Sequence, residues 1–123
     1  MIRRYEESDY EMIAEWYDSW GLAAPSKDLL PPIGLIVDDT VAGFLYNADG
    51  KLALLEGFIS DPNTNLDARS QALDRLVAGL VSLAHKNGLR YAMATLHNES
   101  LIRRAKKFGF IARPTTYLFK ELK

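Results

Sequence analysis

The longest regular pattern of apolar residues lies between Ala68 and Gly88. Apolar side chains recur there every three or four residues, which places them along one face of a helix: Ala72, Leu73, Leu76, Val77, Leu80, Val81 and Ala84. Gly88 follows shortly after the last of them, where a glycine commonly ends a helix. We therefore predict a long amphipathic helix from Ala68 onward, with one face packed against a core.

An apolar run precedes this helix and predicts a buried strand. Residues 52–60 are almost continuously apolar. The strand ends at Asp61-Pro62-Asn63, because proline cannot continue the ladder of hydrogen bonds and Asp and Asn favour turns. A strand that leads through a tight loop into a helix leaves free backbone N–H groups at the helix start, and such groups bind anions. The pattern thus predicts an anion-binding site near the start of the long helix.

The N-terminal part predicts a short strand and a second amphipathic helix. Residues 1–5 can form the strand, and residues 8–11 have the pattern of a capping box, so that the helix begins at about residue 9. Its apolar face carries Met12, Ile13, Trp16, Tyr17 and Trp20, and Gly21 ends it. A turn follows, with a single helical turn over residues 26–30, before a double proline forces the chain to be extended.

The segment before residue 60 predicts an antiparallel meander of three strands. The strands cover residues 34–38, 40–46 and 51–60. Asp38-Asp39 forms the first turn, and the Asp-Gly at the end of residues 47–50 supplies the backbone that a hairpin turn requires.

The C-terminal part predicts a strand, a helix and two closing strands. Residues 89–96 read as a buried strand that runs parallel to residues 52–60, since a single long helix joins the two. The helix that begins near Glu99 turns an apolar face inward, and Gly109 caps it. Residues 110–113 and 115–122 are expected to be strands around Pro114.

Composition narrows the classes of function. The 123 residues suffice for one domain over residues 1–123 and are too few for two. A net charge of −1 offers no field that would attract nucleic acid or an anionic membrane. The chain has no cysteine and its two histidines are isolated, so we expect neither a disulfide framework nor a metal site. With no apolar run long enough to span a bilayer and no signal-peptide segment, a cytoplasmic location is the default expectation.

The order of these elements resembles that of the GNAT N-acetyltransferase superfamily. The similarity covers nearly the whole chain and is closest to small, divergent GNAT-like proteins often carried by bacteriophages. It rests on the strand–Asp-Pro–loop–helix unit, on Asn98 through Gly109-Phe110, and on these residues: Leu30, Pro31, Gly34, Glu56, Phe58, Ser60 and Pro62. The resemblance implies an α/β fold with a mixed, centrally splayed sheet flanked by helices, in the order β-α-α-βββ-α-β-α-ββ.

The resemblance also implies acetyl-CoA as the cosubstrate. In the family, pantetheine pairs with the first of two splayed strands, here through backbone groups near Phe58, Ile59 and Ser60. The pyrophosphate lies on amides at the start of the following helix, which the family motif maps to Asn65, Asp67, Ala68, Arg69 and Ser70. Asn98 either contacts pantetheine or caps the helix that begins near Glu99.

The chain departs from the family at this motif. The family has Gln/Arg-x-x-Gly-x-Gly/Ala, whereas Asn65, Ala68 and Ser70 stand here, so both glycines are missing. Asp67 adds a negative charge near the expected phosphate. An alternative without any ligand is that residues 64–67 approximate a capping box. The tyrosine that protonates the leaving thiolate in many relatives is replaced by Ala105.

Glu56 is the candidate general base, because a carboxylate in the middle of an apolar strand needs a task or a partner. An ion pair with Arg or Lys explains Glu56 equally well.

The remaining candidates each have a functional and a structural interpretation. Tyr17 and Trp20 could line the acceptor pocket or pack in the core. His97 follows a predicted strand, and we interpret it as a surface residue and not as a catalytic histidine. Arg103 and Arg104 belong to a solvated helix face or contact the 3′-phosphate of the nucleotide.

We therefore predict an N-acetyltransferase that moves an acetyl group from acetyl-CoA to an amine by direct attack. The alternative is a catalytically silent GNAT-fold protein that binds a partner protein or a metabolite. The acceptor stays open between amino acid, polyamine, aminoglycoside, protein amine and modified nucleobase, and a homodimer is left open as well.

Overall fold

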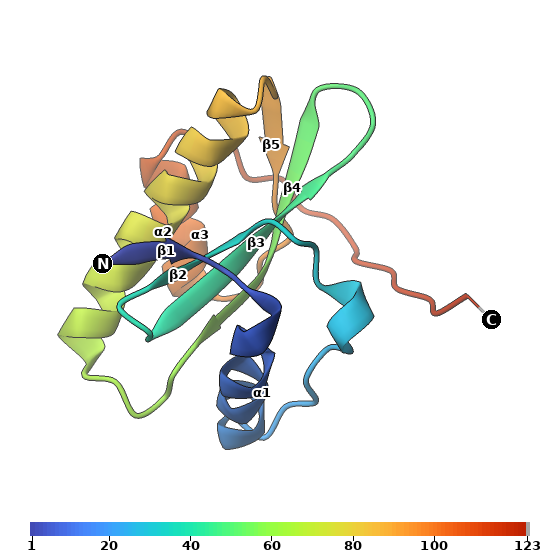
Figure 1. Cartoon of the computed structure of the whole chain (residues 1–123). Coiled ribbons are helices and arrows are strands. Elements are labelled where there is room, and N and C mark those ends of the chain that lie inside the picture. Colours follow the sequence, from blue (N-terminus) through green and yellow to red (C-terminus); the bar gives the residue numbers. More distant parts are fainter. Residues whose placement is uncertain (123) are drawn as a thin grey trace.

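A mixed five-stranded sheet forms the centre of the computed structural model, which describes residues 1–122 (Figure 1). The strands follow one another across the sheet in chain order: β1 (Ile2–Arg4), β2 (Gly34–Val37), β3 (Val41–Asn47), β4 (Leu52–Ser60) and β5 (Tyr91–Met93). The first four are antiparallel, and β5 runs parallel to β4. The predicted meander and the predicted parallel pair are confirmed.

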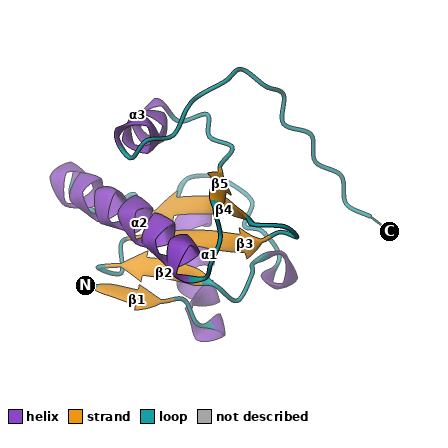
Figure 2. Ribbon diagram, turned by 90° about the horizontal axis from the view of Figure 1, so that it is seen from above, coloured by secondary structure: helices purple, strands orange, loops and turns teal. Residues whose placement is uncertain are grey.

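Helices cover both faces of the sheet (Figure 2). They are α1 (Tyr10–Ser19), α2 (Leu66–Lys86) and α3 (Glu99–Lys107), with short 3-10 turns η1 (Glu7–Asp9) and η2 (Lys27–Leu29). The α2 face of the sheet packs in one apolar cluster and the α1 face in another, so the two helices lie on opposite sides of the sheet. No helix among residues 1–122 is long and apolar enough to cross a membrane.

The long helix α2 packs against the sheet as its periodicity predicts. Leu76, Val77 and Leu80 are buried, whereas Leu73 and Val81 at the borders of the apolar face are half-buried. On the opposite face of the sheet, Ile13 and Trp16 of α1 are buried together with side chains of β2, β3 and β4. These two layers hold β4 from both sides.

A bulge interrupts β4 between its two ends. Phe44 of β3 pairs with Glu56, but Ala42 pairs with Ile59, so that two residues of β4 face one residue of β3. Gly57 takes φ +72°, and a Cβ atom there would lie 3.0 Å from the Phe44 ring. The extra residue shifts the alternation of faces: Leu55 before the bulge and Phe58 after it both pack in the α2 cluster.

The caps of two helices differ from the predicted ones. The predicted box over residues 8–11 is wrong, because the capping bond runs from the Glu6 N–H to Asp9 at 2.8 Å, ahead of α1. Arg3 donates two bonds of 2.9 Å to the same carboxylate and holds the pKa of Asp9 below its usual range. At α2 the single residue Asn65 is the cap, in place of the box over residues 64–67 that was the alternative to a ligand. In the first case Asp9 bonds back to Glu6 and Arg3, a few residues earlier in the chain, and so caps the turn η1 and not α1.

The strand predicted at residues 89–96 is shorter and more exposed than expected. Only Tyr91–Met93 pair with β4, and Tyr91 and Met93 are more than half exposed. No further strand among residues 1–122 lies beyond β5, so one edge of this strand is uncovered.

The two closing strands predicted after Gly109 are absent. Residues 110–122 form no helix or strand and run away from the sheet (Figures 1 and 2). Pro114 alone separates the two predicted strands, and one residue is too short a turn for them to pair with each other. The β-forming composition of this segment therefore has no partner strand within residues 1–122.

Candidate functional site

A cleft opens where β4 and β5 separate. The two strands pair only as far as Leu54 and Met93, after which β4 continues to Ser60 and the chain beyond β5 turns away toward α3. The cleft has a volume of about 540 Å³. Its walls are the end of β4, the segment from Thr95 to Asn98 with the start of α3, and the C-terminal end of α1.

Most of the predicted site residues meet in this cleft. Its lining includes Tyr17, Trp20, Phe58, Ile59, Ser60, Arg69 and Asn98. The predicted residues outside the lining are Glu56, Asn65, Asp67, Ala68 and Ser70. Ser70 instead lines a neighbouring pocket of about 320 Å³, together with Arg103 and Arg104. The fold thus places the predicted residues in and around two neighbouring pockets, which share Ser100.

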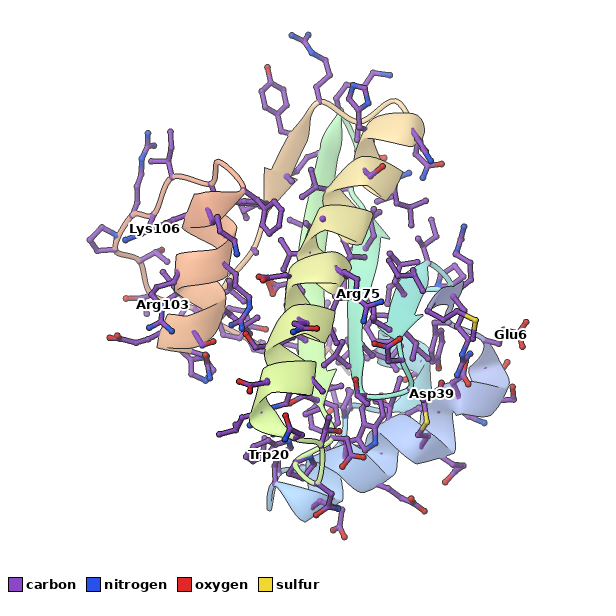
Figure 3. The ribbon with its side chains drawn as sticks, turned by 90° about the vertical axis from the view of Figure 1, so that its left-hand side faces the viewer. Glu6, Trp20, Asp39, Arg75, Arg103 and Lys106 are labelled. Atoms are coloured by element: carbon purple, nitrogen blue, oxygen red, sulfur yellow. The ribbon has the colours of Figure 1, made fainter. Side chains whose placement is uncertain are left out.

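Trp20 lines the cleft and lies near the start of α2 (Figure 3). Its indole N–H donates to the Ser60 carbonyl at 2.7 Å, and the guanidinium carbon of Arg69 lies 5.6 Å from the centre of its ring. This side chain therefore connects the end of α1, the end of β4 and the first turn of α2. Trp20 is 45% exposed, which is consistent with a wall of the cleft and not with the core.

The start of α2 is already occupied by its own cap. The side-chain oxygen of Asn65 accepts from the N–H of Asp67 at 2.9 Å and from that of Ala68 at 3.2 Å. These are two of the amides that the resemblance assigns to a pyrophosphate. An anion at this helix start must either displace the Asn65 side chain or bind farther along, near Arg69.

Glu56 bridges the two strands just beyond the point where they part. Its Oε1 accepts from the backbone N–H of Thr95 at 2.6 Å. Burial raises the pKa of Glu56, and the bond from Thr95 partly offsets that rise. Among residues 1–122 its partner is thus a backbone N–H and not the Arg or Lys that we considered. The sequence offered no signal for Thr95.

Two tyrosines, Tyr17 and Tyr46, pack against the apolar cluster on the α1 side of the sheet. Burial raises the pKa of Tyr46, and the negative charge of Glu56 raises it further. The Tyr46 hydroxyl donates to the Leu29 carbonyl at 3.0 Å. Burial also raises the pKa of Tyr17, so its hydroxyl keeps its proton at neutral pH. Tyr17 lines the cleft, so a phenol that keeps its proton is present at this site.

Arg104 fixes α3 to α2. Its Nε lies 3.1 Å from Asp74, and its guanidinium also donates to the hydroxyls of Ser70 and Ser100. Lys107 lies 3.2 Å from the other oxygen of Asp74. Arg104 thus has a structural role, and of the two arginines considered for a phosphate, Arg103 is the one that stays exposed on α3 (Figure 3).

Comparison with known proteins supports the fold. No protein-family model and no curated protein matches the sequence. Among solved structures, an acetyltransferase of Trypanosoma brucei is 15% identical, with 98% of this chain and 99% of that one covered and a TM-score of 0.70. The structure of yncA from Salmonella typhimurium with its cofactor acetyl-CoA is 18% identical, with 93% and 80% covered and a TM-score of 0.70. A ribosomal-protein-alanine N-acetyltransferase of Brucella melitensis is 13% identical, with 98% of each chain covered and a TM-score of 0.69.

These similarities show that the chain has the GNAT fold, a mixed α/β sheet flanked by helices. The predicted fold class is therefore confirmed, and only the two closing strands are missing from the predicted order. The nearness to phage-carried GNAT-like proteins stays a prediction, as do the roles of the individual site residues. Identities of this size carry over the fold and leave the activity to be argued from the cleft itself.

Proposed function

We propose that the protein is an N-acetyltransferase that moves an acetyl group from acetyl-CoA to an amine by direct attack. The observation that carries the proposal is the half-buried carboxylate of Glu56, held by Thr95 where β4 and β5 part and beside a cleft of about 540 Å³. A structure of the same fold with its cofactor acetyl-CoA supports this choice of cosubstrate.

In the proposed reaction, pantetheine lies along the end of β4, near Phe58, Ile59 and Ser60. The amine nitrogen attacks the carbonyl carbon of the thioester, a C–N bond forms, and the C–S bond breaks. Glu56 takes the proton that the amine loses, directly or through water. The thiolate that leaves must gain a proton, and the hydroxyl of Tyr17 is a source within the cleft, since Ala105 stands where relatives have a tyrosine. Positioning within the cleft supplies the remainder of the rate enhancement.

The alternative is a GNAT-fold protein that binds a metabolite or a partner protein without catalysis. The observation that favours it is the side chain of Asn65, which occupies the amides of Asp67 and Ala68. The carboxylate of Asp67 would also repel a phosphate at this place. Under this alternative the start of α2 is stabilised by its own cap and binds no nucleotide.

Titration calorimetry with acetyl-CoA and with free CoA separates the two functions. The enzyme hypothesis expects saturable heat at one site per chain, and release of free thiol when amines are added in turn. A small-molecule amine and a protein amine are both to be tried, because the cleft leaves the acceptor class open. Absence of heat with both ligands would overturn the N-acetyltransferase and support the silent binder.

Arg69 provides a charge test at the same site. Its guanidinium lies at the cleft in the first turn of α2, so Arg69→Glu should weaken acetyl-CoA binding. The matched control is Arg90→Glu, because Arg90 is exposed at the opposite end of β5. Arg75 is unsuitable as a control, because it donates to Asp38 and its replacement would break that ion pair. Equal losses in the two variants would indicate non-specific attraction.

A further inference from the structure

The end of β4 turns a backbone carbonyl toward the cleft. On the side of β5, the strand is paired only as far as Leu54. On the side of β3, the N–H of Asp61 donates to the Thr40 carbonyl at 2.8 Å, and the next pair in the register is that of Ser60 with Val41. The direction of the backbone groups alternates along an antiparallel pair, so those of Ser60 point away from β3. The Ser60 carbonyl therefore faces the edge that a ligand along β4 would follow.

The indole of Trp20 occupies this carbonyl. Trp20 lies where the end of α1 meets the start of α2 (Figure 3), and its N–H donates to the Ser60 oxygen at 2.7 Å. Both residues line the cleft, so the ring lies in the space that a ligand along this edge would take. An indole N–H is a donor like the amide N–H groups of pantetheine. In the free protein, a side chain of the chain itself thus holds the acceptor that the ligand would use.

The backbone at Trp20 is fixed, whereas its side chain has room to rotate. The N–H of Gly21, whose φ is +73°, donates to the Asp18 carbonyl at 2.9 Å. The N–H of Leu22 donates to the Tyr17 carbonyl at 2.9 Å. These two bonds form a Schellman motif, which ends α1. The Trp20 side chain is exposed, so it can leave the Ser60 carbonyl by rotation about its own bonds while α1 stays in place.

We propose that Trp20 is a gating residue, whose indole N–H holds the Ser60 carbonyl in the free protein and rotates away when acyl-CoA binds along β4. This inference rests on the proposed function, because the pantetheine of acyl-CoA is the ligand expected at this edge. The bond from Trp20 to Ser60 must break before the ligand pairs with the carbonyl. The wild type therefore binds acyl-CoA more weakly than a variant in which the carbonyl is unoccupied.

Titration calorimetry with CoA compares the wild type with Trp20→Phe. This variant loses the indole N–H and keeps an aromatic ring beside Arg69. It should bind CoA roughly 2- to 10-fold more tightly, the range that one hydrogen bond contributes. Adenosine 3′,5′-bisphosphate, the nucleotide part of CoA without pantetheine, should bind both proteins equally well.

Leu22→Ala is the matched control for the size of the cleft. Leu22 lines the cleft with an apolar, exposed side chain, so its truncation widens the cleft and leaves the bond from Trp20 to Ser60 in place. CoA affinity in this variant should stay close to that of the wild type. Circular dichroism checks that both variants are folded.

The indole N–H gives a second measurement, which does not depend on affinity. The chain has two tryptophans, so a proton–nitrogen correlation spectrum of labelled protein contains two indole signals, and Trp20→Phe identifies the one that belongs to Trp20. A hydrogen bond to a carbonyl raises the chemical shift of the proton. Saturation of the wild type with CoA should therefore lower the proton shift of Trp20 and leave that of Trp16 nearly unchanged.

The outcomes separate the gating role from the proposed function. If the wild type binds CoA and Trp20→Phe binds it no more tightly, the gating role is overturned and the proposed function stands. An equal gain in Leu22→Ala, an equal gain with the nucleotide alone, or a Trp20 proton shift that CoA does not lower would have the same meaning. Binding by Trp20→Phe alone would support both proposals. Absence of CoA binding in both proteins would overturn both.

Discussion

At the scale of single residues, Glu56 owes its position to its neighbour. Gly57 has φ +72°, a conformation that a side chain would strain, and it starts the bulge that shifts the alternation of β4. Glu56 is the last residue of β4 that pairs regularly with β3 before this shift, and it lies just beyond the point where β5 stops pairing with β4. Its carboxylate is therefore held between two strands by the N–H of Thr95 and is half-buried.

Glu56→Gln tests the role of the carboxylate as a base. Glutamine keeps the oxygen that accepts from Thr95 and removes the charge, so turnover should fall roughly 10²–10⁴-fold while acetyl-CoA affinity changes little. Burial raises the pKa of Glu56 above its ordinary 4.5. In the wild type, kcat/KM should therefore fall as the pH drops through this raised value, and the variant should lack that decline. Initial rates of both proteins across the pH range check this. A normal rate in the variant at every pH would exclude Glu56 as the base.

The same pKa shift has the opposite effect on stability. Between 4.5 and its raised pKa in the folded state, Glu56 binds more protons when the chain is folded than when it is unfolded. Its contribution to the free energy of unfolding is therefore present at low pH and lost as the pH rises through the raised pKa. Glu56→Gln should not show this loss. In urea unfolding at several pH values, the free energy of unfolding of the variant should therefore rise relative to that of the wild type as the pH rises.

Sequence reasoning identified Glu56 but not its partner. The residue stands out because a carboxylate interrupts an apolar strand, and that signal is local. Thr95 lies 39 positions away, on a segment whose path depends on where β5 stops pairing. The contact between Trp20 and Ser60 could not be predicted for the same reason. Trp20 does line the cleft, and its role in binding a substrate stays a prediction.

At the scale of elements, α2 is the clearest case of a pattern that determines packing. Its apolar positions recur with helical spacing, and the ones at the centre of the face, Leu76 and Leu80, are fully buried. Leu76→Ala should lower the free energy of unfolding by about 2–5 kcal/mol, because it leaves a cavity in a close-packed layer. Urea denaturation measures the loss. Leu66→Ala, on the same helix but 70% exposed, should change it by no more than about 0.5 kcal/mol.

The cap of α2 links stability to ligand binding. Asn65→Ala removes the oxygen that accepts from Asp67 and Ala68, so the free energy of unfolding should fall by about 0.5–2 kcal/mol. If a phosphate binds at this helix start, the freed amides should raise the affinity for acetyl-CoA in calorimetry. Asn87→Ala, at the C-terminal end of the same helix, is the control and should leave the affinity unchanged. A lower affinity in Asn65→Ala would show that the Asn65 side chain itself holds the ligand.

Helices, strands and turns were predictable where the local sequence alone determines the backbone conformation. The hairpin at Gly50 and the end of α1 at Gly21 followed from single residues, and both glycines take positive φ. The bulge at Gly57 was not predicted, because it depends on how β4 meets Phe44 of β3. β5 was predicted too long, since a strand extends only as far as its neighbour pairs with it.

At the scale of the whole molecule, the net charge of −1 is the sum of acidic and basic segments that lie in different parts of the chain. Residues 6–18 contain six carboxylates and no Lys or Arg, whereas α3 contains four basic residues and one acidic residue. The basic helix lies beside the cleft and the pocket of Ser70, and the acidic segment belongs to α1 and η1. An anion that approaches the cleft from the α3 side is therefore attracted locally, although the molecule as a whole is nearly neutral.

This division predicts a salt dependence. Acetyl-CoA binding should weaken as the ionic strength rises, because exposed charges are screened over about 10 Å at 0.1 M salt. Arg103→Gln, which removes an exposed charge outside the Arg104 network, should flatten the dependence of affinity on salt. Calorimetric titrations at several salt concentrations check both statements. An affinity that does not change with salt would show that α3 plays no part in binding.

The arrangement of the whole sheet was predictable up to β5 and not beyond it. Short turns such as Asp38-Asp39 place neighbouring strands side by side, and the long helix α2 requires the parallel crossover to β5. The segment from Thr115 to Phe119 has the composition of a strand, but composition does not provide a partner. A strand forms only where its backbone pairs with an edge, and residues 111–122 pair with none among residues 1–122.

The positions of the two tryptophans have a practical consequence. Trp16 is 5% exposed within the α1 layer, and Trp20 lies at the cleft between the Ser60 carbonyl and Arg69. Indole emission changes with the polarity of its surroundings, so the fluorescence of Trp16 reports whether the molecule is folded, and that of Trp20 reports what enters the cleft. The chain contains no other tryptophan. Trp16→Phe would leave a single built-in optical sensor at the site, and occupancy could then be followed in real time without an attached dye.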